Sequence, residues 1–327
     1  MEVYFVRDST VERGGVEDLR RLLARDDGIT WVDIPEFDDE AAGVLSDVFA
    51  FHPMAIRSCA ERNRVPTIHA YPEYFFFTLH GPELGEAGHV HYIELDQFIG
   101  KNYIVTVHGP VDPAVGPDVV VRETKAVLAR IEAGRFKPSL PAEVSYGLVS
   151  ALTRHMSAFL ENLTTTAWLL EQRVTTGQLA DPEQLLEEMF QTRHGLLAVG
   201  TMATSDREVY TRMVKLARNV PQESWPLMED VTDQFNRVSG LAAAQREYMQ
   251  GVIDYYRART DTKMTIAAER LAVVAVVTLP VTALASVYGM NIIVNDTTDG
   301  IHLAVVIAVM LAISGLLLHW AKRQGWF

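Results

Sequence analysis

Charged residues are spread over the first 270 residues of this chain and are nearly absent from two stretches close to its C-terminus. Residues 271–295 contain no Asp, Glu, Lys, Arg or His, and residues 301–320 contain only His302 and His319. A helix that crosses a lipid bilayer needs about 20 predominantly apolar residues. The pattern therefore predicts two membrane-spanning helices, joined by a turn that carries Gly and Asn.

Residues 1–140 show the patterns of both strands and helices. Short β-branched or aromatic runs bounded by Gly, Pro or Asp predict strands at 3–7, 30–34, 74–80, 89–98 and 103–108. Helical spacing of apolar residues predicts helices at 16–25, 39–49 and 119–132. The unbroken apolar run at 74–80 is typical of a central strand that is covered on both faces. This part is predicted to be an α/β domain with a mixed sheet.

Strand signals stop after Pro141, and the rest of the chain reads as helical. One long helix is predicted over 143–174. Asp181 followed by Pro182 is an N-cap signal that opens another helix, and 207–219 is predicted as a separate, third helix.

The last helix before the first span carries a heptad seam. Its positions are Met228, Val231, Phe235, Val238, Ala242, Gln245, Met249, Val252 and Tyr256. No proline interrupts this helix before Pro280, so we expect it to continue into the first span. A seam of this kind needs neighbours, and we expect partner copies to pack around it.

These patterns divide the chain as follows: a cytoplasmic α/β domain at 1–140, a cytoplasmic helical stalk at 141–263, a first transmembrane helix at 264–291, an external loop at 292–300, a second transmembrane helix at 301–321 and a cytoplasmic tail at 322–327. The orientation follows from the positive-inside rule. Basic residues flank both spans on the side of the chain termini, whereas the loop has none and contains Asp296 and Asp299. We therefore expect an integral protein of the cell inner or plasma membrane with both termini in the cytoplasm.

The bulk composition excludes some functions. A formal net charge of -13 disfavours binding to nucleic acid, because phosphates would be repelled. The single cysteine, Cys59, cannot form an intramolecular disulfide. No nucleophile elbow, phosphate loop or His-Glu-x-x-His pattern is present, so no enzyme is predicted. His89 and His91, with His80 nearby, could hold zinc, but two histidines on one strand face are more often simply exposed.

Hydroxyl residues recur inside the first span. Thr278, Thr282 and Ser286 are four residues apart and therefore share one helical face. They could bond back to carbonyls four residues earlier or join helices together, or they could line a polar path. Pro280 frees the carbonyl oxygen of residue 276, which in lipid needs a partner or water.

The end of the first span resembles the CorA family of divalent cation transporters. The resemblance rests on four motifs: Tyr288-Gly289-Met290-Asn291 before a short loop and a final span, Leu271 with Pro280 and Thr282 in the first span, residues 229–233 at the base of the long helix, and His52-Pro53-Met54 in the N-terminal part. Together these motifs extend over most of the chain.

The resemblance implies a homopentamer in lipid, with αβα cytoplasmic domains and five copies of the first span around a pore for divalent cations. Mg²⁺ is the expected transported ion, with Zn²⁺ or Co²⁺ as alternatives. Gly289, Met290 and Asn291 would form the selectivity filter, and Asp230 would be half of a regulatory metal site. The pore-lining face would include Leu271, Ala275, Leu279, Thr282 and Ser286.

The chain departs from the family pattern in two places. Arg57 and Ser58 stand where the family has an acidic pair that completes the regulatory site, and residues 292–296 replace the usual Met-Pro-Glu loop. Because of the first departure, a cation facing Asp230 would meet a guanidinium or a hydroxyl instead of a second carboxylate. Besides Mg²⁺ or Zn²⁺ transport, a membrane-tethered cytoplasmic binding or sensor module remains an alternative, although a pure tether has no use for a polar face in the first span.

Overall fold

The computed structural model describes residues 1–63, 65–85, 88–110, 113–177, 181–216, 224–289 and 300–323. The chain divides into two compact units, Met1–Val252 and Ile253–Phe327. The strands are β1 (Glu2–Arg7), β2 (Thr10–Gly14), β3 (Ile29–Ile34), β4 (Ile68–Ala70), β5 (Phe75–Leu84), β6 (Val90–Ile99) and β7 (Tyr103–Val107). The helices are η1 (Val16–Asp18), α1 (Leu19–Leu23), α2 (Asp39–Asp47), α3 (Pro53–Ala60), α4 (Pro117–Val120), α5 (Arg122–Glu132), α6 (Pro141–Thr176), α7 (Pro182–Leu216), α8 (Trp225–Gly289) and α9 (Gly300–Arg323).

Among the described residues, the strands form one seven-stranded sheet in the order β2-β1-β3-β7-β6-β5-β4. β3 and β7 pair in parallel, and the other neighbours pair antiparallel. The predicted mixed sheet is therefore confirmed. β5 and β6 form its longest pair, and their register sets His80 opposite Glu94.

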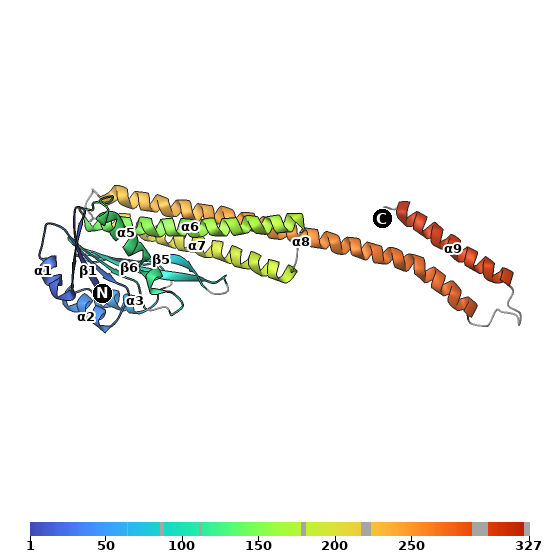
Figure 1. Cartoon of the computed structure of the whole chain (residues 1–327), viewed down its shortest axis with the longest axis horizontal. Helices are drawn as coiled ribbons and strands as arrows, with labels where there is room; N and C mark the ends of the chain where they lie inside the picture. The colour runs from blue at the N-terminus through green and yellow to red at the C-terminus, as the bar shows by residue number, and fades with distance from the viewer. Residues whose placement is uncertain are drawn as a thin grey trace. The chain divides into compact units, whose positions relative to one another are not determined.

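Helices cover both faces of this sheet. On one face, α1, α2 and α3 pack against apolar side chains of β1, β3, β5, β6 and β7. On the other face, α5 and α6 pack against β1, β3 and β7, while α6, α7 and the first part of α8 pack against β5. Figure 1 shows these two groups of helices on opposite sides of the strands. The αβα arrangement expected from the resemblance is confirmed.

Two strands and one helix were not predicted, because their sequences are short or carry few apolar residues. β2 and β4 lie at the sheet edges and have five and three residues. α3 has eight residues, which is too few to establish a helical period. His52-Pro53-Met54 forms its start: the His52 side chain accepts a hydrogen bond from the Met54 backbone N–H, and Pro53 occupies the first turn.

The prediction of a separate helix at 207–219 was wrong, because α7 runs unbroken from Pro182 to Leu216. Asp181 caps its start as predicted, accepting hydrogen bonds from the backbone N–H groups of Glu183 and Gln184. The middle of α7 is polar enough to suggest a break, but Val199, Met202 and Ala203 are buried beside β5 and α6. Tertiary packing therefore keeps this region helical.

The heptad seam on α8 is buried, but its partners differ from those we expected. Met228, Val231, Phe235 and Val238 belong to one apolar cluster with side chains of α6 and α7 of the same chain. Phe235 is fully buried, and its ring lies 6.1 Å from that of Tyr210 on α7. The expectation that partner copies cover this part of the seam is therefore wrong, and the seam is not by itself a sign of oligomerisation.

Candidate functional site

In the part of the chain that the structure describes, both predicted membrane spans are helical and neither is covered by other residues. Over windows of 18 residues, the mean hydropathy reaches 2.0 in α8 and 2.4 in α9, and only 6% and 0% of these windows are buried. A core helix of a soluble protein would be mostly buried, so the length, composition and exposure of these helices are those of membrane spans.

The residues expected to line a pore lie on the exposed surface of α8. Leu271 and Leu279 are 71% and 66% exposed, and Ala275, Thr282 and Ser286 are also exposed. Successive members are three or four residues apart, which places them along one helical face. In a single chain this face has no cover from the described residues, so it is available to lipid, water or another copy.

Two hydroxyl groups on this face bond back to their own helix. Thr278 Oγ1 donates to the Val274 carbonyl oxygen at 2.8 Å, and Thr282 Oγ1 donates to the Thr278 carbonyl oxygen at 2.8 Å. A hydroxyl that has committed its hydrogen in this way keeps its oxygen lone pairs as acceptors. Back-bonding and pore lining are therefore compatible at these positions.

The first residue of the expected filter lies at the end of the same helix. Gly289 is the last residue of α8, and a Cβ added there would meet nothing within 4 Å in the single chain. The described residues therefore give no steric reason for a glycine at this position. Met290 and Asn291 lie outside the described residues.

Asp230 is held by neighbours on α6 and α8. Its Oδ2 atom accepts hydrogen bonds from the Tyr146 hydroxyl at 2.8 Å and from Gln234 Nε2 at 2.6 Å. Gln234 in turn bonds to Ser150 and Thr153 of α6. Burial, followed by the bond to Asp230, raises the pKa of Tyr146. The carboxylate is partly buried in a polar network, and it is neither a freely solvated helix residue nor part of an in-chain pair with Arg57.

Arg57 and Ser58 lie on α3, which packs on the opposite face of the sheet from α8. Arg57 is exposed and makes no ion pair with another described residue. The Ser58 carbonyl oxygen accepts a hydrogen bond from Asn63 Nδ2 at 2.8 Å. Within one chain, the structure therefore does not bring Arg57 or Ser58 to Asp230.

The structure gives no support to the zinc interpretation of His80, His89 and His91. Among the described residues, no group of three or more His, Cys, Asp or Glu side chains is arranged to hold a metal ion. His80 is 1% exposed and bonds through Nε2 to the Asn63 carbonyl oxygen at 2.5 Å. It has a structural partner within the domain.

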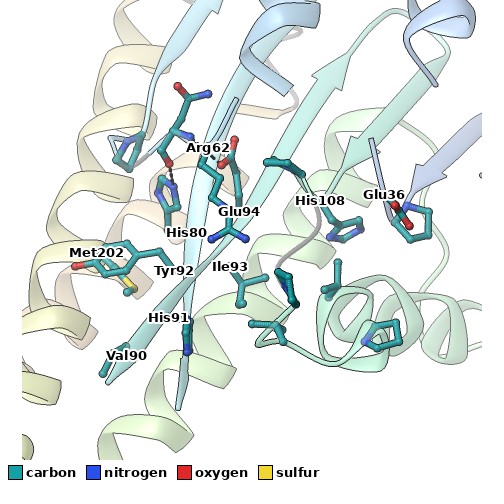
Figure 2. A pocket seen from close by; sticks show the side chains of 18 of the residues that line it. Glu36, Arg62, His80, Val90, His91, Tyr92, Ile93, Glu94, His108 and Met202 are labelled. Atoms are coloured by element: carbon teal, nitrogen blue, oxygen red, sulfur yellow. Dashed lines mark hydrogen bonds between the residues drawn. The ribbon is translucent and has the colours of Figure 1, made fainter. Parts of the chain in front are cut away.

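The sequence analysis missed a group of buried polar residues beside a cavity. A cavity of about 800 Å³ is lined by His80, Glu94 and His108 together with proline, valine and isoleucine side chains (Figure 2). In the sequence, Glu94 is marked only by a second acidic residue, Asp96, two positions further along a strand of mixed apolar and polar residues.

Comparisons with known proteins agree over almost the whole chain. Residues 26–323 match the family described as "CorA-like Mg2+ transporter protein". The putative metal ion transporter YfjQ of Bacillus subtilis is 25% identical over 312 residues, which cover 91% of this chain and 89% of that protein. The cobalt/magnesium transport protein CorA of Thermotoga maritima is 22% identical over 307 residues, which cover 91% of this chain and 83% of that protein.

A solved structure shows the same fold. The complete structure of the CorA magnesium transporter from Methanocaldococcus jannaschii superposes with a TM-score of 0.80 at 18% sequence identity, covering 100% of this chain and 99% of that chain. At this level of identity the superposition supports the fold: a soluble domain, a long helix and two C-terminal spans.

The fold and the two uncovered apolar helices define an integral membrane protein with a large αβα domain. Its first span presents a face of small, apolar and hydroxyl residues. The family match extends over residues 26–323, and the chain belongs to the CorA family of divalent cation transporters. The members of this family are channel-like transporters and not enzymes.

Proposed function

We propose that this protein carries Mg²⁺ into the cytoplasm through a pore at the centre of a homopentamer. The observation that carries the proposal is the uncovered face of α8 with Leu271, Ala275, Leu279, Thr282 and Ser286, which leads to Gly289 at the helix end. Gly289, Met290 and Asn291 would form the entrance filter. The positive-inside pattern supports cytoplasmic termini and therefore a filter on the outer side.

The chemistry of this face suits a hydrated cation. Mg²⁺ gives up its water reluctantly and usually keeps several water molecules, whose O–H groups point outwards as donors. The oxygens of Thr278 and Thr282 have committed their hydrogens to the helix and are left as acceptors. A face of neutral acceptors can bind the water shell weakly enough for the ion to leave again, which conduction requires.

The same face supports assembly. Facing lipid, the hydroxyl groups of this face would make no better contacts than apolar side chains would. Several copies around a common axis would instead bring these hydroxyl groups together along one water-filled path. The buried part of the seam on α8 adds no argument for oligomers, because α6 and α7 cover it.

We expect native mass spectrometry of the detergent-solubilised protein to detect an assembly of five copies. Detection of monomers or dimers alone would contradict the proposed pore.

The proposed ion preference rests on the chemistry of the filter. The relatives' names mention magnesium, cobalt and an unspecified metal ion. A filter of amide and carbonyl oxygens suits Mg²⁺, since oxygen ligands are its preferred partners. Zn²⁺, which binds more strongly to nitrogen and sulfur, is the alternative that a transport assay must include.

Thr282 provides a specific test of the pore face. We expect Thr282→Val, which keeps the shape and removes the hydroxyl, to lower Mg²⁺ flux about tenfold, because a lost hydrogen bond to a strongly polarised group costs roughly 1.5 kcal/mol. Thr282→Ser keeps the hydroxyl and is the matched control, with flux near that of the wild type. Flux would be measured in proteoliposomes at equal protein content, and unchanged flux in Thr282→Val would exclude this residue from the ion path.

Regulation by cytoplasmic Mg²⁺ is expected to be weak. A divalent ion gains from two facing carboxylates, whereas a guanidinium at one of those positions repels it. We therefore expect millimolar Mg²⁺ to give the wild-type protein little protection from protease, and Arg57→Glu to increase that protection. If the wild type is already strongly protected, and Asp230→Ala abolishes the protection, the regulatory site exists and this expectation is wrong.

A further inference from the structure

Two carboxylic acids are buried side by side in the first compact unit, Met1–Val252, which is called the soluble unit below. Glu94 and Asp96 are two residues apart on β6, so their side chains leave the same face of the strand. They are 6% and 0% exposed. Burial of two ionised carboxylates at neighbouring positions is costly, because each charge loses its hydration and repels the other.

Each carboxyl group has one oxygen with a donor and one without. Glu94 Oε2 accepts from the Asn63 backbone N–H at 3.0 Å, and Asp96 Oδ1 accepts from the Thr78 hydroxyl at 2.5 Å. Among the described residues, Glu94 Oε1 and Asp96 Oδ2 meet no donor. Because a strand rises about 3.4 Å per residue, the Cα atoms of Glu94 and Asp96 are about 7 Å apart on one face of β6, a span that two carboxyl side chains can bridge. A single proton between them would satisfy both remaining oxygens.

We propose that Glu94 and Asp96 form a proton-binding site in which protonated Glu94 donates a hydrogen bond to Asp96, and that loss of this proton loosens the packing of α3 on the sheet. The proton lies on Glu94 Oε1 and points to Asp96 Oδ2. When it leaves to solvent, two facing carboxylates remain without a donor between them. No other reactant is needed.

The pKa shifts of the pair agree with this assignment. Burial, and then the charge of Asp96, raise the pKa of Glu94 to about 8, and burial also raises the pKa of Asp96. A carboxyl whose pKa is higher in the folded than in the unfolded protein stabilises the fold at low pH, and this contribution is lost as the pH rises through the folded value. The site is therefore expected to lose its proton just above neutral pH.

The proton has a route to water. Glu94 lines the cavity of about 800 Å³ and points from β6 towards the same side as His80 on the neighbouring strand (Figure 2). Burial lowers the pKa of His80, which favours the neutral form of its ring. Among the described residues, the other charged or titratable groups that line the cavity or face the pair are Glu36, Cys59, Arg62, His91, Tyr92 and His108.

The pair is connected directly to the end of α3. Asn63, which donates to Glu94, also donates from Nδ2 to the Ser58 carbonyl oxygen at 2.8 Å and accepts from His80. Cys59 on α3 is fully buried against Asp96. Ionisation of both carboxyl groups is therefore expected to loosen the packing of α3. This helix carries Arg57 and Ser58, the positions at which the chain departs from its family.

Infrared spectroscopy of the full-length protein tests the proton itself. We expect a protonated-carboxyl band at neutral pH that is lost in Glu94→Gln and retained in Glu61→Gln, which makes the same change at the exposed end of α3. In Asp96→Asn, the midpoint at which this band disappears should shift to lower pH, because the neighbouring charge is gone. A band unchanged in Glu94→Gln, or a midpoint unchanged in Asp96→Asn, overturns the proposal. Glu94→Gln and Asp96→Asn test the proposal independently, so either variant alone is sufficient if the other does not fold.

Cys59 reports on the movement of α3 because it is the single cysteine of the chain. Its labelling by a neutral maleimide should rise about tenfold per pH unit from thiolate formation alone. Between pH 6 and 8.5 we expect a steeper rise in the wild type and in Glu61→Gln, and only the tenfold slope in Glu94→Gln. Equal slopes in the wild type and Glu94→Gln would show that deprotonation of the pair does not release α3.

Discussion

Replacement of Asn291 by alanine is expected to reduce divalent cation flux about a hundredfold or more while the assembly stays intact, since five filter amides are lost together. Asn291 follows Gly289 at the end of α8 and carries the only oxygen-bearing side chain between Ser286 and Asn295 apart from Tyr288. An amide oxygen accepts hydrogen bonds from the water shell of the ion without binding the ion as tightly as a carboxylate would. No neighbouring side chain offers the same chemistry.

Asn295→Ala is the matched control for this prediction, because it removes the same amide a few residues further along. We expect it to keep most of the flux. Both variants would be compared with the wild type in proteoliposomes at equal reconstituted amounts, and native mass spectrometry would verify the assembly. Wild-type flux in Asn291→Ala would rule out the filter.

Replacement of Phe235 by alanine is expected to destabilise the soluble unit by about 3–5 kcal/mol, the usual cost of removing a buried aromatic side chain. Phe235 is fully buried where α8 packs on α6 and α7, and it contacts Tyr210. The loss should appear as a lower midpoint of thermal or denaturant unfolding of that unit, at any protein concentration.

Leu241→Ala serves as the control for Phe235→Ala. Leu241 lies on the same helix and is 56% exposed, so its truncation should cost less than about 0.5 kcal/mol. If Phe235→Ala destabilised only the oligomer, with a cost that disappears on dilution, the seam would be an interface between copies after all. Our description of α8 would then be wrong.

The architecture could be predicted from the sequence wherever a pattern is long. The two spans follow from long uncharged stretches and α6 follows from its long helical pattern. The strands β1, β3, β5, β6 and β7 follow from β-branched or aromatic runs between turn residues. The short edge strands β2 and β4 and the eight-residue α3 could not be predicted, because tertiary packing and capping hold them and their own patterns are too brief. The seam on α8 was located correctly, but a stripe of apolar residues does not say whether its cover comes from the same chain.

The residues of the candidate site could be predicted from their spacing in the sequence, but their hydrogen-bond partners could not. The spacing of Thr278 and Thr282 predicts that they share one helical face. Their hydrogen bonds to backbone carbonyl oxygens are visible only in the structure. The hydrogen bonds of Asp230 to Tyr146 and Gln234 join side chains of two helices, which a motif within α8 cannot reveal. For the same reason, the buried pair Glu94 and Asp96 drew no attention in the sequence, since its meaning depends on Asn63 and Thr78.

Uptake of Mg²⁺ into proteoliposomes tests the central claim most directly. An encapsulated dye would report entry of Mg²⁺, Co²⁺ or Zn²⁺ under an inside-negative potential, with empty liposomes and Asn291→Ala vesicles as references. We expect saturable Mg²⁺ entry that the potential accelerates, that exceeds Zn²⁺ entry and that is nearly absent from both references. Entry of Zn²⁺ without Mg²⁺ would contradict the proposed ion, and the absence of any divalent flux from correctly assembled protein would contradict the pore.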